Sequence, residues 1–169
     1  VDVRLGTRAT EGELTAYSGL DGLDRTILDA LQEDGRLTNV DLARRVGLSP
    51  SPCLRRVKSL EERGYIQGYA ALLDPALLGR ALQVVVMVRL TDQRQQTLAA
   101  FESAVEGIED VLRCLLIAGD ADYLLTVQVR DLDSYHALYT ERLGELPGVS
   151  SLRSLVTMKT VKDTHALPV

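Results

Sequence analysis

One stretch of the chain limits the possible folds more than any other. It runs from Asn39 to Gly68 and reads NVDLARRVGLSPSPCLRRVKSLEERGYIQG. Asn39 is a good helix N-cap, and the apolar residues after it recur at helical spacing. Gly47 and Gly64 stand where helices commonly end in a left-handed residue. The stretch therefore predicts two helices that are joined by a tight turn.

The second predicted helix has an apolar face and a basic face. Leu54, Val57 and Leu60 recur at helical spacing and would pack into a small core. The other face carries hydroxyl and basic side chains: Ser51, Arg55, Arg56, Lys58, Ser59 and Arg63. This division is typical of the recognition helix of a helix-turn-helix protein, which enters the major groove of DNA. Two amphipathic helices joined by a turn occur in many proteins, but the offsets of Ala43, Gly47 and the LSPSP turn favour DNA binding.

A third helix is predicted before this pair, between Leu20 and Gly35, with Asp21 as its cap. Its apolar residues fall on one face and would complete a three-helix core: Leu23, Ile27, Ala30 and Leu31. A β-hairpin is expected from Tyr65 to Leu73. Together these elements predict a winged helix-turn-helix domain over residues 20–74.

The second half of the chain alternates predicted strands and helices after a connection over residues 75–80. The predicted strands cover 81–91, 110–118, 122–130 and 151–162, and the predicted helices cover 95–106 and 132–146. This βαββαβ order predicts a ferredoxin-like domain over residues 81–163, with both helices on one face of an antiparallel sheet. The chain would then be an α+β protein, with residues 1–19 as an extension and residues 164–169 as a tail.

The first predicted strand of this domain is apolar on both faces. One face would carry Leu82, Val84, Val86, Val88 and Leu90, and the other Ala81, Gln83, Val85, Met87 and Arg89. A strand that is apolar on both faces is usually covered on both faces, and the two helices can cover only one of them. The sheet of a second copy would cover the other face and form a two-fold homodimer. The alternative is that these side chains are simply exposed.

The charges are distributed unevenly along the chain. A net charge of −5 argues against DNA binding if it is taken alone. Residues 44–63, however, hold six Arg or Lys against two Glu, whereas residues 69–169 hold nine Arg or Lys against thirteen Asp or Glu. A basic face on an acidic body can bind phosphate.

Other classes of protein are poorly supported. The sequence contains no run of the ~18 apolar residues that span a membrane, and no basic and apolar leader. Cys53 and Cys114 form no metal or redox motif, so a reducing cytoplasm is the expected setting. Cys53 lies near a helix N-terminus, which could lower its pKa, although a packed small residue is the other interpretation. No nucleophile elbow, phosphate loop or dinucleotide fingerprint is present, so an enzyme is not expected. Paired aromatic side chains for RNA are lacking too.

Both halves resemble one family. GLSPSPCLRRVKSLEERGYIQGY resembles the DNA-binding segment of the Lrp/AsnC family of bacterial and archaeal regulators, and LIAGDADYLLTVQVRDLDSY resembles its effector-binding (RAM or ACT-like) domain. The resemblance runs from about Leu20 to Val161 and is greatest to the leucine-responsive branch. It implies binding to double-stranded DNA and homodimers that assemble further, for example to octamers. It also implies an amino-acid effector between dimers, such as leucine, methionine or another apolar amino acid, and no other cofactor or metal.

The site residues follow from these two interpretations. We expect Ser49, Ser51 and Lys58 to hold phosphates, and Arg55, Arg56 and Ser59 to read bases, with Pro52 in the first turn of the helix. A Gly-Asp-x-Asp loop on its own is often only a polar turn. The resemblance implies that effector-binding residues are Gly119, Asp120, Asp122, Tyr123, Leu132, Leu155, Val156 and Thr157. Leu155 stands where the leucine-responsive branch has an aromatic residue, which leaves the effector open.

Two other functions remain open from the sequence. One is a ligand-independent protein that shapes DNA. The other is an amino-acid-sensing interaction module whose winged helix does not bind DNA.

Overall fold

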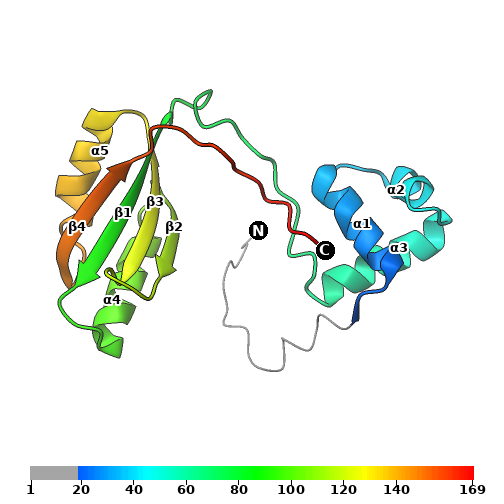
Figure 1. The fold of residues 1–169 in the computed structure, drawn as a ribbon, viewed down its shortest axis with the longest axis horizontal. Coiled ribbons are helices and arrows are strands. Elements are labelled where there is room, and N and C mark those ends of the chain that lie inside the picture. Colours follow the sequence, from blue (N-terminus) through cyan, green and yellow to red (C-terminus); the bar gives the residue numbers. More distant parts are fainter. Residues whose placement is uncertain (1–18) are drawn as a thin grey trace. The chain divides into compact units, whose positions relative to one another are not determined.

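The computed structural model describes residues 19–169, which form two compact units (Figure 1). One unit contains the residues up to Leu72 together with the tail Lys162–Val169, and the other contains Leu73–Val161. The extension expected over residues 1–19 lies outside the described residues except for Gly19. Among residues 19–169, every helix is too short or too polar to serve as a membrane span.

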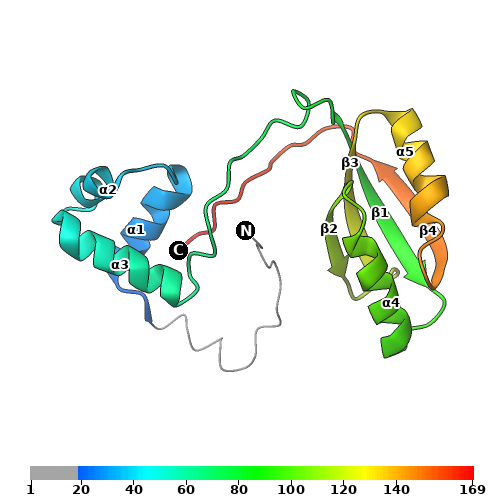
Figure 2. The ribbon, with the colours of Figure 1, turned by 180° about the vertical axis from the view of Figure 1, so that it is seen from behind.

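The first unit is built from three helices, α1 (Gly22–Glu33), α2 (Asn39–Arg45) and α3 (Pro50–Glu62), seen from both sides in Figures 1 and 2. All three contribute to one core of buried side chains: Ile27, Leu28, Ala30, Leu42, Ala43, Val46, Cys53 and Leu60. The predicted three-helix core is therefore confirmed, except that Leu23 on α1 is 36% exposed and lies outside it. The C-terminal tail belongs to this unit because the side-chain amide of Gln32 bonds both the backbone N–H and the carbonyl of Leu167, at 2.6 and 3.0 Å.

The start of α2 differs from the expectation. Thr38, and not Asn39, is the N-cap, and its hydroxyl accepts a hydrogen bond from the Asp41 N–H at 3.2 Å. Asn39 is instead the first helical residue, and its side-chain amide donates to the Pro50 carbonyl at 2.9 Å. Its side chain thus ties the start of α2 to the start of α3. The glycines that end the helices are as predicted, since Gly47 and Gly64 have φ angles of 72° and 77°.

Two further expectations about this unit are wrong. Leu54 does not face the core and is 44% exposed, because Cys53 takes the buried position in line with Val57 and Leu60. The hairpin expected from Tyr65 to Leu73 is not formed, and the structure shows no strand between α3 and residue 82. Tyr65 and Ile66 pack against the helical core, but Leu72 is 76% exposed, so a second arm of the ribbon would have no core on which to gain stability.

The second unit has the predicted βαββαβ order. Its elements are β1 (Leu82–Leu90), α4 (Gln95–Glu106), β2 (Val111–Leu116), β3 (Tyr123–Val129), α5 (Leu132–Leu138), the π-helical turn η2 (Tyr139–Leu143) and β4 (Val149–Val156). The four strands form an antiparallel sheet in the order β2-β3-β1-β4. The last strand ends at Val156, earlier than expected, and the last predicted helix is α5 with η2. The Thr140 hydroxyl donates to the His136 carbonyl at 2.9 Å in this π-helical turn.

One face of the sheet is covered by both helices. The buried residues of β1 and β3 share a core with α4, α5 and η2, which contribute Phe101, Val105, Tyr135, Leu138 and Leu143. On the opposite face of β1, Val85 and Met87 are half-buried and Arg89 is exposed. The predicted alternation along this strand is therefore confirmed, and its second face carries no helix of this unit.

Candidate functional site

The residues expected to contact DNA lie along α3 and the residue before it. Of these seven residues, Ser49, Ser51, Arg55 and Lys58 are exposed, and Pro52, Arg56 and Ser59 are half-buried. A shallow open hollow of about 460 Å³ runs beside this part of the helix. Its lining residues are Asp24, Leu48, Pro52, Arg55, Arg56, Ser59 and Arg63.

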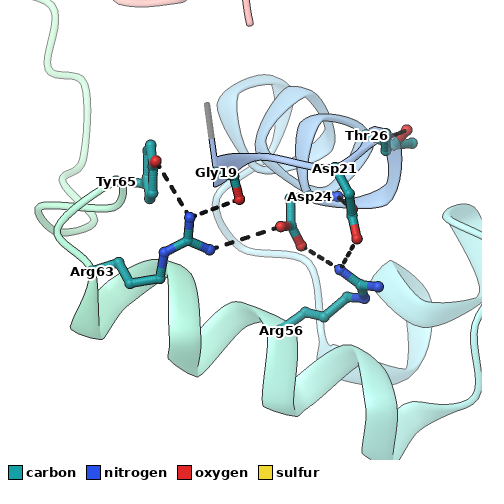
Figure 3. A network of polar contacts seen from close by, with 8 residues as sticks. Gly19, Asp21, Asp24, Thr26, Arg56, Arg63 and Tyr65 are labelled. Carbon is teal, nitrogen blue, oxygen red and sulfur yellow. Dashed lines mark hydrogen bonds and ion pairs between the residues drawn. The ribbon is translucent and has the colours of Figure 1, made fainter. Parts of the chain in front are cut away.

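Arg56 points toward α1 and not away from the domain (Figure 3). Its Nη1 atom lies 2.7 Å from a carboxylate oxygen of Asp21 and 2.6 Å from one of Asp24. The Asp24 N–H and the Arg56 guanidinium both bond the Asp21 carboxylate and hold its pKa below the ordinary value. The two carboxylates in turn raise the pKa of Arg56. A residue expected to read bases is therefore already paired inside the domain.

Arg63, the C-cap residue of α3, joins the same network about two turns beyond Arg56. Its guanidinium lies 3.9 Å from the second oxygen of Asp24 and donates to the Gly19 carbonyl at 2.8 Å (Figure 3). It also lies 4.7 Å above the centre of the Tyr65 ring. Asp24 is not among the residues predicted from the sequence to act at this site. The available signal was the pair of acidic residues three apart at the start of α1, Asp21 and Asp24.

Arg55 and Lys58 differ from Arg56. Both are exposed, and neither makes a hydrogen bond or ion pair with any residue that the structure describes. No acidic residue lies in the first turn of α3. The N-terminal half of this helix therefore offers unpaired positive charge together with the partial positive charge of its helix dipole.

Asp122 lies in the loop between β2 and β3 and turns inward. Its side chain is buried, and its two oxygens accept hydrogen bonds from the Leu90 N–H at 2.7 Å and from the Gln93 side-chain amide at 2.6 Å. Its backbone N–H also donates to the Val88 carbonyl at 2.9 Å. The carboxylate thus joins the end of β1 to the start of β3, and both of its oxygens are already occupied.

The first part of the same loop is open. Gly119 has a φ of 146°, which strongly favours glycine. Asp120 is exposed, and the Arg89 guanidinium holds the loop by donating to its backbone carbonyl, with Nε at 3.2 Å. The Asp120 carboxylate makes no hydrogen bond with any described residue. Gly119 and Asp120 are therefore the parts of the loop that face solvent.

Tyr123 belongs to the core of the unit. It is 1% exposed, its ring lies 4.6 Å from that of Phe101, and its hydroxyl donates to Glu102 at 2.7 Å. Burial, with the Glu102 carboxylate, raises the pKa of Tyr123 well above its usual range. A residue expected to bind the effector is thus packed beneath the loop.

The remaining effector residues lie at the other end of the sheet. Leu132, Leu155 and Val156 are 62%, 42% and 47% exposed, and Thr157 follows them at the end of β4. The Thr157 N–H bonds the carbonyl of Gln83, whereas the Asp122 N–H bonds that of Val88. At ~3.3 Å per residue along β1, these attachment points are roughly 17 Å apart. One copy of the chain therefore does not bring the two groups of effector residues together.

Comparison with known proteins identifies both units. A family described as the Lrp/AsnC ligand binding domain matches residues 83–167, and one described as winged helix-turn-helix DNA-binding matches residues 20–67. The chain belongs to the Lrp/AsnC family. It is 47% identical over 148 residues to the leucine-responsive regulatory protein of Escherichia coli K12, covering 88% of this chain and 90% of that protein. It is 45% identical over 157 residues to that of Serratia marcescens, covering 93% and 96%.

Solved structures of Lrp/AsnC regulators share the fold. A transcriptional regulator from Neisseria meningitidis in complex with L-methionine matches with a TM-score of 0.85 and 40% identity, over 88% of this chain and 96% of that one. A feast or famine regulatory protein from Mycobacterium tuberculosis, complexed with L-methionine, matches with a TM-score of 0.79 and 33% identity, over 89% and 100%. This protein is accordingly a transcriptional regulator with a helix-turn-helix DNA-binding domain and an amino-acid-binding domain.

Cys53 of this Lrp/AsnC regulator has a structural position. It is fully buried in the three-helix core, and burial raises the pKa of its thiol. The interpretation of Cys53 as a packed small residue is therefore confirmed, and its pKa is raised because burial removes the thiol from water. Within residues 19–169, no group of three or more His, Cys, Asp or Glu side chains is arranged to hold a metal ion.

Proposed function

We propose that this Lrp/AsnC regulator binds double-stranded DNA as a dimer and that a small apolar amino acid changes its assembly. The observation that carries the DNA-binding part is the exposed basic face of α3, on which Arg55 and Lys58 have no partner among the described residues. Two copies related by a two-fold axis would present two such helices to successive major grooves of a pseudo-palindromic site. Because its target would be chromosomal DNA, we place the protein in the cytoplasm.

Different side chains on α3 would contact the phosphates and the bases of the DNA. Ser49, Ser51 and Lys58 would hold phosphates around the first turns of the helix, which Pro52 helps to start. Arg55 and Ser59 would face base edges, since they lie one turn apart on the same side of α3. Arg56 would contact DNA only after leaving Asp21 and Asp24.

The open face of the sheet supports the dimer. Leu115, Leu124 and Met87 lie in one cross-strand row that ends at Arg153. Val85 and Leu155 lie in the next row, which also holds Thr126 and Arg113. Leu115 and Leu155 are each 42% exposed in a single copy. The sheet of a second copy would remove this apolar surface from water. Larger assemblies such as octamers would then join dimers.

The distribution of the effector residues supports a ligand shared between copies. The loop with Gly119 and Asp120 lies at one end of the sheet, and Leu132, Leu155, Val156 and Thr157 lie at the other. A ligand that contacts both groups must lie between two copies. The loop would bind the ammonium and carboxylate groups, and the apolar residues would surround a side chain such as that of methionine or leucine. Asp122 and Tyr123 would support the loop from beneath. Such a ligand shifts assembly only by its different affinity for the two states.

DNA binding can be tested with one variant and one control. Arg55→Ala should weaken binding by about 1–3 kcal/mol at a site selected from random duplexes if Arg55 reads a base. Arg25→Ala removes the same charge from an exposed position of α1. Fluorescence anisotropy at fixed salt should show a much smaller loss for Arg25→Ala, and equal losses would contradict the role of Arg55.

The effector can be tested by light scattering with each common amino acid added in turn. A change of assembly size with an apolar amino acid is expected, and Asp120→Ala should abolish it while DNA binding remains. Asp120→Ala is the sharper variant because Asp122→Ala also removes two internal hydrogen bonds. No size change with any amino acid would favour a ligand-independent protein that shapes DNA.

A further inference from the structure

The hydrogen bonds and ion pairs around Asp24 suggest a role in DNA recognition for a residue that does not contact DNA. Asp24 and Asp122 are the buried carboxylates among the residues that the structure describes. Asp24 lies on α1 and is 7% exposed, yet it bonds Arg56 on α3 and lies in ion-pair contact with Arg63, the residue that caps the C-terminal end of α3 (Figure 3). A buried carboxylate is costly unless it is well paired. Its position between two arginines of the recognition helix therefore calls for an explanation.

We propose that Asp24 is a positioning residue for DNA recognition, which holds α3 in the rotation that directs Arg55 and Ser59 at base edges. This inference rests on the proposed DNA-binding function of α3. Asp24 does not contact DNA itself. It acts through Arg56 and Arg63.

Asp24 contacts two arginines along one side of α3, and these two contacts limit how far the helix can rotate about its axis. Arg56 and Arg63 are seven residues apart, which places them about two turns apart on nearly the same side of α3. Arg56 reaches one oxygen of Asp24 at 2.6 Å, and Arg63 lies 3.9 Å from the other. α3 is held in the core by Cys53 and Leu60, and two polar contacts along one line add resistance to both rotation and tilt. Arg55 precedes Arg56 and is turned by about 100° from it, so the rotation fixed at Arg56 sets the direction of Arg55.

The charges in this network nearly balance. Two carboxylates, Asp21 and Asp24, face two guanidinium groups, Arg56 and Arg63. The network therefore adds little net attraction for phosphate, and the unpaired charge on α3 comes from Arg55 and Lys58. Asp24→Asn could change the affinity for DNA in two ways, and the two changes have opposite signs. Simple charge removal near DNA should strengthen binding, whereas loss of positioning should weaken it at the preferred sequence.

The test compares the full-length chain with Asp24→Asn and with the charge-matched double variant Asp24→Asn/Arg56→Gln. Two probes are used: a duplex selected from a random pool with the wild-type protein, and an unrelated duplex of equal length. Dissociation constants are measured over a range of salt concentrations, at a temperature where calorimetry and circular dichroism show every variant to be folded. Arg25→Ala is the control for surface charge on α1.

Loss of positioning has a distinct signature. Asp24→Asn should weaken binding to the selected duplex by roughly tenfold, the scale of one lost base contact, and change binding to the unrelated duplex by less than about twofold. The slope of log affinity against log salt should stay the same, because no phosphate contact is removed. The double variant should lose about as much as Asp24→Asn alone, since both residues act in one unit.

Two outcomes would overturn the inference. Equal or tighter binding of the selected duplex by folded Asp24→Asn would mean that Asp24 does not position α3. An equal loss on both duplexes, with a smaller salt slope, would mean that the network binds phosphate. Should Asp24→Asn not fold, Arg56→Lys keeps the charge but loses the planar fork, and an unchanged preference for the selected duplex would overturn the inference equally. If the wild-type chain selects no duplex at all, the DNA-binding function itself is contradicted.

Discussion

The helical unit and the sheet unit each bury an aspartate, and the two carboxylates are stabilised in different ways. Asp24 is paired with positive charge, since the Arg56 guanidinium contacts it directly and Arg63 lies nearby. Asp122 has only uncharged donors, the Leu90 N–H and the Gln93 amide. Charge pairing joins two helices, whereas the hydrogen bonds of Asp122 close the end of a strand. The stabilisation of Asp24 therefore depends on the charge of its partners and on salt. The stabilisation of Asp122 depends on whether the Leu90 N–H and the Gln93 amide each keep an acceptor.

The largest effect is expected when Asp122 is removed. Asp122→Ala leaves the buried Leu90 N–H and the amide of the exposed Gln93 without their acceptor, and should lower the free energy of unfolding of the sheet unit by about 2–4 kcal/mol. Asp122→Asn keeps one acceptor oxygen and should cost about half as much. Calorimetry gives the free energies, and hydrogen exchange at residues 88–93 shows where protection is lost. Similar stability of the two variants would contradict the structural role of the carboxylate.

A smaller loss is expected when a partner of Asp24 is removed. Arg56→Ala leaves the buried carboxylate with only the more distant Arg63, and should cost roughly 1–3 kcal/mol of stability of the helical unit. Arg55→Ala is the matched control, because the neighbouring guanidinium makes no bond to any described residue and its loss should stay within about 0.5 kcal/mol. Thermal unfolding measures both. Equal shifts would mean that the ion pairs do not stabilise α3.

Added salt should change the stability contribution of Asp24 and leave that of Asp122 nearly unchanged. At 1 M salt the screening length falls to about 3 Å, so the destabilisation by Arg56→Ala should shrink because the partly exposed pair is weaker in the wild type. The destabilisation by Asp122→Asn should change little, since its partners carry no charge. The measurement is the difference in melting temperature between each variant and the wild type at 0.1 and 1 M sodium chloride. A parallel decrease for both variants would remove the distinction between them.

The smallest effect is expected at an exposed carboxylate, Asp131, which caps α5. Its side chain accepts a hydrogen bond from the Ser134 N–H at 2.8 Å, and its contacts with Ser134 and then Arg130 lower its pKa from 3.8 to about 2. Because the folded-state pKa is the lower one, its contribution to stability is present above pH ~4 and is lost as the pH falls toward 2. Melting temperatures between pH 2 and 5 should therefore fall less steeply in Asp131→Asn than in the wild type.

Asp133→Asn is the control for this pH dependence. Asp133 is an exposed carboxylate on the same helix and makes no hydrogen bond with any described residue. Its variant should keep the slope of the wild type. If Asp131→Asn also keeps it, the capping bond does not contribute to acid stability.

Much of the fold could be predicted because helices and strands leave periodic patterns in a short window of sequence. The apolar residues of α1 and α2, the left-handed Gly47 and Gly64, and the alternation along β1 are all local signals. The errors arose where a local pattern had two solutions. Cys53 and Leu54 are adjacent and both apolar, and only the packing of α3 against the other helices decided which one is buried. The segment after α3 has the composition of a hairpin, but only its first residues, Tyr65 and Ile66, pack on the helical core.

The candidate sites could be predicted from the sequence less completely than the fold. Residue types and their spacing are enough to predict that α3 is basic, that the chain forms a helix-turn-helix unit and a βαββαβ unit, and that a Gly-Asp-x-Asp loop joins two strands. The packing of distant elements sets three features that residue spacing does not reveal: Arg56 turns inward, Asp122 bonds the end of β1, and Tyr123 lies in the core. The bonds from Arg56 to Asp24 and from Leu90 to Asp122 each span 32 residues. Periodicity encodes which side of an element is buried, but the partner of a polar side chain is set by which distant element packs against it.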